Sequence, residues 1–212
     1  MELQCRIILI LLVPLQRILL SISDMRMTKL LLIVACCLPL CVLAACQPKN
    51  QTSMNDNNKT LVAYFSATGT TMEAATKLAK LANADLHEIV PETRYTPADL
   101  NWQDKTSRSS VEMADKSSRP AIANKVENIE QYDTIFVGFP IWWYIAPTIV
   151  NTFLEQYDLN GKTIVPFFTS GGSEAGETLQ YLKPSAPGAN FLDPKNLTRM
   201  DEAQIKAWLE TL

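Results

Sequence analysis

The stretch from Leu61 to Thr71 constrains the fold of this chain most. It reads Leu-Val-Ala-Tyr-Phe and then Ser-Ala-Thr-Gly-Thr-Thr, so a run of apolar and aromatic residues stops at hydroxyl side chains around one glycine. A strand, a short loop and a helix in this order place backbone N–H groups at the start of the helix, where they converge on an anion. The helical pattern begins at once, with one apolar stripe formed by Met72, Ala75, Leu78, Ala79 and Ala82.

The loop itself supplies the groups that an anion site needs. Ser66, Thr68, Thr70 and Thr71 add side-chain donors, and Gly69 lets the backbone approach a ligand closely. The loop has no Lys or Arg, so a phosphate would be held by neutral dipoles. The alternative is a plain strand-to-helix turn in which Thr70 and the glutamate three residues later form a capping box. Four hydroxyls in six positions exceed what a cap requires and favour the anion site.

Two later apolar runs, residues 134–139 and 163–168, are typical of strands covered on both faces. Shorter strands are predicted at 86–90 and, weakly, at 189–192, with helices between the strands. This alternation predicts an α/β fold with a parallel sheet and helices on both faces. Right-handed crossovers then bring three loops together at the carboxyl edge of the sheet, where a ligand would touch them all. These loops are 66–71, 140–145 and 169–173.

The middle loop reads Pro140-Ile141-Trp142-Trp143-Tyr144. Three consecutive aromatic side chains cannot all enter a core from a loop, so we expect at least one to stack on a planar ligand. The alternative, that the rings plug the end of the sheet, applies to one of them.

Residues 92–119 form a long polar segment with few large apolar side chains, among them Tyr95 and Trp102. Thr96-Pro97 predicts the start of a short helix that carries Leu100 and Trp102. The segment is either a functional loop over the site or a loose connection, and its aromatic residues favour the first.

Charge and cysteine usage exclude several kinds of protein. Residues 47–212 carry 15 basic and 20 acidic side chains, a net charge of −5 without a basic patch, which argues against nucleic acid as a partner. The single histidine, His87, lies in a short apolar segment and is not expected to bind metal. The domain also has no thiol for a disulfide or a metal site, because every cysteine lies at or before position 46: Cys5, Cys36, Cys37, Cys41 and Cys46.

Residues 1–46 have the pattern of an export signal. A short basic region precedes the apolar run 30–45, and the end, Leu-Ala-Ala-Cys46, resembles a bacterial lipobox, which implies cleavage before Cys46 and lipid on its sulfur. The alternative is a membrane anchor, but the run is short for a hydrocarbon core of about 30 Å. Residues 1–24 hold a second apolar run that a signal does not need, which favours a true start at Met25 or Met27.

Residues 47–59 are polar and rich in Asn, so they are predicted to be a flexible tether between lipid and a domain spanning 60–212. The protein is therefore expected to be exported and lipid-anchored in the cell envelope, facing the periplasm. Gln47 after the cysteine, by resemblance to Gram-negative lipoproteins, implies the outer membrane.

From residue 60 onward the chain resembles the flavodoxin-like FMN-binding domains. The resemblance rests on residues 64–71, 132–143 and 161–173, with further matches at 95–102 and 107–109. It implies a three-layer fold with a five-stranded parallel sheet of order 2-1-3-4-5 and FMN as the cofactor. The sequence departs from the family at Tyr144, where glycine is expected, and in the weak final strand. By this likeness residues 66–71 hold the FMN phosphate, and the flavin ring is lined by residues 140–144 and by Thr169, Ser170, Gly171 and Gly172.

Two kinds of function follow. The first is a flavin redox protein, which either reduces a small oxidant such as a quinone or carries electrons to a membrane or periplasmic partner. FMN is expected in place of FAD because the hydroxyl loop suits one terminal phosphate. The second is a lipid-tethered binding module that keeps the fold without the cofactor. The hydroxyls of the loop favour the first, and no residue is predicted to act as a catalytic acid, base or metal ligand.

Overall fold

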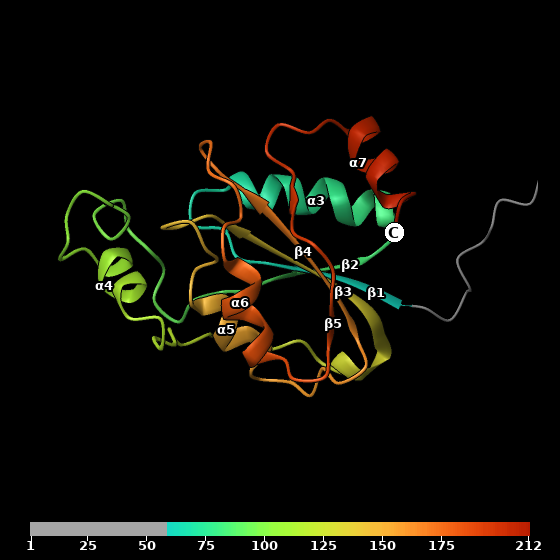
Figure 1. Cartoon of the computed structure of the whole chain (residues 1–212), viewed down its shortest axis with the longest axis horizontal. Helices are drawn as coiled ribbons and strands as arrows, with labels where there is room; N and C mark the ends of the chain where they lie inside the picture. Colours follow the sequence, from blue (N-terminus) through green and yellow to red (C-terminus); the bar gives the residue numbers. More distant parts are fainter. Residues whose placement is uncertain (1–58) are drawn as a thin grey trace, which may run out of the picture. The chain divides into compact units, whose positions relative to one another are not determined.

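The computed structural model describes residues 59–212 (Figure 1). The predicted signal segment, the lipidation site Cys46 and the predicted tether up to residue 58 lie outside the described residues. The first strand begins at Lys59, one residue before the predicted start of the domain. In this part of the chain, the helices are all too short or too polar to cross a bilayer.

A parallel sheet forms the centre of the domain, and its order β2-β1-β3-β4-β5 is the predicted 2-1-3-4-5. The fifth position is shared by two short strands, which pair with different parts of β4. Pro194 lies between them, and proline cannot donate to a ladder, which explains the break. The strands are β1 (Lys59–Tyr64), β2 (Asp85–Glu88), β3 (Tyr132–Pro140), β4 (Thr163–Thr169), β5 (Asn190–Phe191) and β6 (Lys195–Asn196).

Helices cover both faces of the sheet, and α4 stands apart from these two layers (Figure 1). One face is covered by α3 (Thr70–Ala82) and α7 (Glu202–Leu209), and the other by α5 (Ile149–Leu154) and α6 (Thr178–Leu182). The remaining helical elements are α4 (Arg108–Ala114) and the 3-10 turns η1 (Ile129–Gln131) and η2 (Lys183–Ser185).

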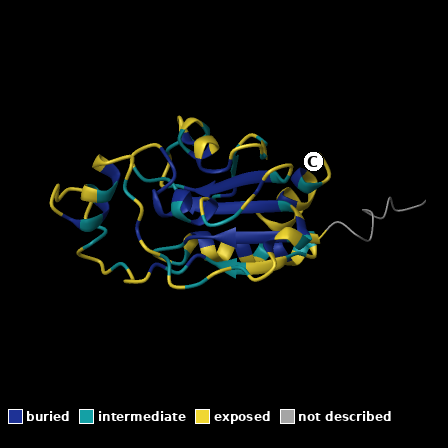
Figure 2. Ribbon diagram, turned by 90° about the horizontal axis from the view of Figure 1, so that it is seen from below, coloured by how far each residue is buried: buried dark blue, intermediate teal, exposed yellow. Residues whose placement is uncertain are grey.

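Successive residues of the strands enter two separate cores. Leu61 and Ala63 belong to the core under α5, whereas Val62 and Tyr64 belong to the core under α3 and α7. Because side chains of a strand alternate between faces, a strand buried on both sides must be apolar throughout. The continuous apolar runs in the sequence have this cause, and the central strands β1, β3 and β4 are the most buried part of the domain (Figure 2).

The capping box considered as the alternative to an anion site is absent at the start of α3. The N-cap is Gly69, with a left-handed φ of 95°, and it makes no side-chain cap. Thr70 is already helical, and Glu73 pairs with Lys77 at 2.9 Å. Glycine is favoured at such a φ because it lacks a Cβ. The loop hydroxyls therefore do not cap the helix through Thr70.

The short helix predicted from Thr96 is a turn. Residues 97–100 have turn geometry, although Thr96 and Asp99 cap each other as a helix start would: the Thr96 N–H donates to Asp99 Oδ2 at 2.8 Å. Asn101 begins a second turn, stabilised by its own side chain, which accepts from the N–H of Gln103. Such local bonds offer the backbone an alternative to helix.

Candidate functional site

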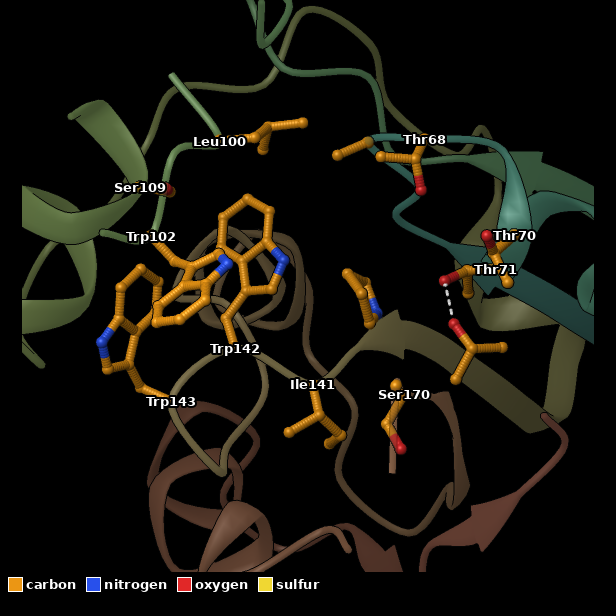
Figure 3. A pocket seen from close by; sticks show the side chains of 14 residues that line it. Thr68, Thr70, Thr71, Leu100, Trp102, Ser109, Ile141, Trp142, Trp143 and Ser170 are labelled. Carbon is orange, nitrogen blue, oxygen red and sulfur yellow. Dashed lines mark hydrogen bonds between the residues drawn. The ribbon is translucent and has the colours of Figure 1, made fainter. Parts of the chain in front are cut away.

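Three loops at the carboxyl edge of the sheet enclose a pocket of about 540 Å³. Figure 3 shows the threonines of the first loop on one side and three indole rings on the other. The sequence-predicted site residues that line the pocket are Thr68, Thr70, Thr71, Pro140, Ile141, Trp142, Trp143, Thr169, Ser170 and Gly171. The residues that line it without having been predicted as cofactor-binding are Ala67, Leu100, Trp102 and Ser109.

The other predicted residues do not line the pocket. Ser66 and Gly69 shape the first loop, because the Ser66 hydroxyl accepts from the Gly69 N–H at 3.1 Å. In the third loop, the Gly172 N–H donates to the hydroxyl of Ser170 at 3.2 Å. Tyr144 points outward with 70 % of its surface exposed. These residues determine the path of the backbone around the pocket.

The first loop leaves hydroxyls free for a ligand. Thr71 is buried, and its hydroxyl lies 2.8 Å from that of Thr169. Within the described part of the chain, the side-chain hydrogen bonds of this loop are those of Ser66 and Thr71. The hydroxyls of Thr68 and Thr70 line the pocket without such a partner, so they can donate to an anion.

The aromatic loop is a tight turn with a strained backbone. Trp142 and Ile145 exchange backbone hydrogen bonds of 3.0 and 3.1 Å, and the two residues between them have positive φ: 47° for Trp143 and 66° for Tyr144. A left-handed conformation costs a non-glycine residue roughly 1–2 kcal/mol. Tyr144, which replaces the glycine expected in the family, therefore lies at a position where glycine would relieve the backbone strain. Strain of this kind is concentrated at functional sites.

One indole of this loop packs on the domain and another is exposed. Trp142 contacts Phe65 and Tyr95 edge to face, with ring centroids 5.6 and 5.3 Å apart. Trp143 is 41 % exposed and lines the pocket. The prediction that one ring plugs the sheet end fits Trp142, whose ring nevertheless also forms part of the lining.

Residues 92–119 form the remaining wall and are fixed by a cluster around Tyr95. The Tyr95 hydroxyl donates to Glu112, and the Arg108 guanidinium lies 4.0 Å from the centre of the Tyr95 ring. Arg108 also pairs with Glu112 at 2.6 Å. Burial, followed by the hydrogen bond to Glu112, raises the pKa of Tyr95, so its hydroxyl stays protonated. These contacts favour the interpretation of this segment as a wall of the site over a loose connection.

The lining of the pocket contains no charged side chain among the described residues. A ligand there meets hydroxyls and backbone groups near Thr68 and Thr70, and indole and aliphatic surface near Trp102 and Trp143. Such a site suits a molecule with an anionic end and a planar aromatic end.

A model of the flavodoxin family matches residues 59–212. The chain belongs to the flavodoxin family. A candidate flavoprotein of Bacteroides eggerthii is 54% identical, with a TM-score of 0.70 over 73% of this chain and 98% of that one. A second, from Bacteroides uniformis, is 48% identical, with a TM-score of 0.70 over 73% and 99%. No curated protein matches the chain.

A more distant structure supports the fold alone. It is a flavoprotein of Lactobacillus acidophilus in complex with FMN, 23% identical, with a TM-score of 0.55 over 72% of this chain and 99% of that one.

The two Bacteroides chains consist almost entirely of the domain that matches this chain. Those two domains therefore fold without a segment like the one that precedes residue 59 here.

Proposed function

We propose that residues 59–212 bind FMN in the pocket between the three loops. The observation that carries this proposal is the uncharged pocket itself, with free threonine hydroxyls at one end and indole rings at the other. A protein of the same fold accepts FMN. Thr68, Thr70 and Thr71 would hold the phosphate, whereas residues 140–143, Ser170 and Gly171 would flank the ring. When bound, FMN supplies one- and two-electron transfer.

The flavin extracted from the purified protein tests this function. We expect a yellow protein that releases FMN on denaturation, identified by mass spectrometry at about one molecule per chain. FAD in place of FMN would contradict a site built for one terminal phosphate. A colourless protein that also fails to take up added FMN would support the alternative, a binding module without a cofactor.

The electron acceptor in this proposal is a small flat molecule such as a quinone. Leu100, Trp102 and Trp143 form an apolar wall, and Trp102 is 70 % exposed, so it can cover a planar ligand. Ser109, buried in the same wall, adds one hydroxyl that can donate to a carbonyl oxygen. The net charge of −5 over residues 47–212 gives a weak field for steering a cationic protein partner.

Replacing Trp102 by alanine should raise KM for a quinone about three- to tenfold, because aromatic stacking contributes roughly 0.5–1.5 kcal/mol. The assays are run at saturating FMN, so that a change in FMN affinity does not enter KM. Leu86→Ala is the control, because Leu86 is exposed on β2 and does not line the pocket. Steady-state assays with dithionite or a reduced nicotinamide as donor and a panel of quinones measure the effect.

An unchanged KM in the Trp102→Ala variant would remove this wall from the acceptor site. No turnover with any quinone, together with two well separated one-electron steps in a redox titration, would instead support an electron carrier for a membrane or periplasmic partner.

We further propose that Cys46 is the lipidated first residue of the mature protein, that residues 47–58 tether the domain, and that the protein faces the periplasm. The basic and then apolar segment that closes on Leu-Ala-Ala-Cys46 supports this. Mass spectrometry of protein extracted from the native membrane should find residues 1–45 absent and lipid on the Cys46 sulfur. An intact N-terminus or an unmodified Cys46 would contradict the anchor, and Cys46→Ser should abolish the lipid.

A further inference from the structure

Thr71 and Thr169 form a buried pair of hydroxyls in the lining of the pocket. Thr71 belongs to the first turn of α3, and Thr169 is the last residue of β4, 98 positions later. Their Oγ1 atoms are 2.8 Å apart, with the residues 1% and 3% exposed. Figure 3 shows this bond at the side of the pocket where Thr70 lies.

Only one proton can lie between two hydroxyl oxygens, although each hydroxyl carries a proton of its own. The pair therefore has two arrangements, in which either Thr71 or Thr169 is the donor. In each arrangement the accepting hydroxyl keeps its own proton for another partner. Within residues 59–212, neither side chain makes a further hydrogen bond, so this second proton is available to a ligand in the pocket.

We propose that Thr169 is a positioning residue for the phosphate. The Thr169 hydroxyl donates a hydrogen bond to Thr71 Oγ1, and the Thr71 hydroxyl is then free to donate its own hydrogen bond to the FMN phosphate. This inference rests on the proposed FMN site. A phosphate dianion only accepts hydrogen bonds, so it selects the arrangement in which Thr71 points its proton at the anion. Accepting a bond from Thr169 also polarises the Thr71 hydroxyl and strengthens it as a donor.

The backbone at Thr169 is fixed independently of this side chain. Thr169 is paired with Pro140 in the β3–β4 ladder, and its carbonyl oxygen accepts from the Ile141 N–H at 2.9 Å. Valine has the branched shape of threonine without the hydroxyl. Thr169→Val therefore removes the proton donor while the strand and the loop after it keep their own hydrogen bonds.

Titration of the apo-domain, residues 59–212, with FMN and with riboflavin tests the proposal, because riboflavin has the same ring and ribityl chain without the phosphate. Thr169→Val should weaken FMN binding about three- to tenfold and leave riboflavin binding within twofold. Thr169→Ser, which keeps a hydroxyl, should bind FMN nearly as the unaltered domain does. The double variant Thr71→Val/Thr169→Val should lose no more than Thr71→Val alone, because Thr169 acts through Thr71.

Equal losses of FMN and riboflavin affinity in Thr169→Val would overturn the inference, since Thr169 would then contact the flavin or shape the pocket. Additive losses in the double variant would overturn it as well. FMN affinity unchanged in Thr169→Val would reject the positioning role while the FMN site stands. Failure of the unaltered domain to bind either ligand would instead reject the proposed function. Thermal melts of each variant identify any general loss of structure.

Discussion

Replacing Gly138 by alanine should lower the free energy of unfolding by about 3 kcal/mol, the upper end of the cost of overpacking a core. A Cβ at this position would lie 2.2, 2.5 and 2.8 Å from three carbons of the Phe167 ring. The two residues are paired neighbours on β3 and β4, and Phe167 is fully buried, so the ring cannot move aside. Urea unfolding of residues 59–212 measures the change.

Gly171→Ala is the matched control, because Gly171 has open space around it and no positive φ. Its effect on the unfolding free energy should stay within about 0.5 kcal/mol, as for an ordinary surface change. Phe167→Leu shortens the opposing side chain. It should therefore lower the free energy of unfolding less in the Gly138→Ala background than in the unaltered domain. Equal stability of the two glycine variants would contradict the close packing of β3 against β4 at this point.

Replacing Thr68 by alanine should weaken FMN binding about ten- to a hundredfold, because a hydrogen bond to a charged acceptor contributes roughly 1.5–3 kcal/mol. The Thr68 hydroxyl lines the pocket and, among residues 59–212, has no protein partner to compete with the phosphate. Fluorescence titration of the apo-domain with FMN measures the loss, and riboflavin should bind this variant as it binds the unaltered domain.

Thr76→Ala supplies the control for Thr68→Ala. Thr76 lies on α3, the helix that follows the Thr68 loop, but its hydroxyl donates to the Met72 carbonyl oxygen at 2.8 Å and does not line the pocket. The control should leave FMN affinity unchanged. An unchanged affinity in Thr68→Ala as well would remove Thr68 from the phosphate site.

The sequence predicted those parts of the fold that a local pattern specifies. β3 and β4 lie in the predicted apolar runs because strands with helices on both faces must be apolar at every position. The three loops meet at one edge because parallel strands with right-handed crossovers end on the same side. The apolar pattern of the strands and the handedness of the crossovers thus predict the three loops that supply most of the pocket lining.

The parts that the sequence did not predict depend on contacts between distant residues or on backbone conformation. The wall that carries Ser109 is held by Tyr95, Arg108 and Glu112, and no local period encodes that cluster. The start of α3 is set by the left-handed φ of Gly69, a backbone conformation that the capping pattern of Thr70 does not reveal. The sequence shows that Tyr144 replaces a glycine of the family, but the outward direction of its side chain follows only from the turn geometry.

A crystal structure of residues 59–212 grown with FMN tests the central claim most directly, namely that the pocket between the three loops is the cofactor site. The structure should show the phosphate within hydrogen-bond distance of the Thr68, Thr70 and Thr71 hydroxyls, and the flavin ring flanked by residues 140–143, Ser170 and Gly171. A flavin bound elsewhere, or a phosphate remote from the 66–71 loop, would contradict the account.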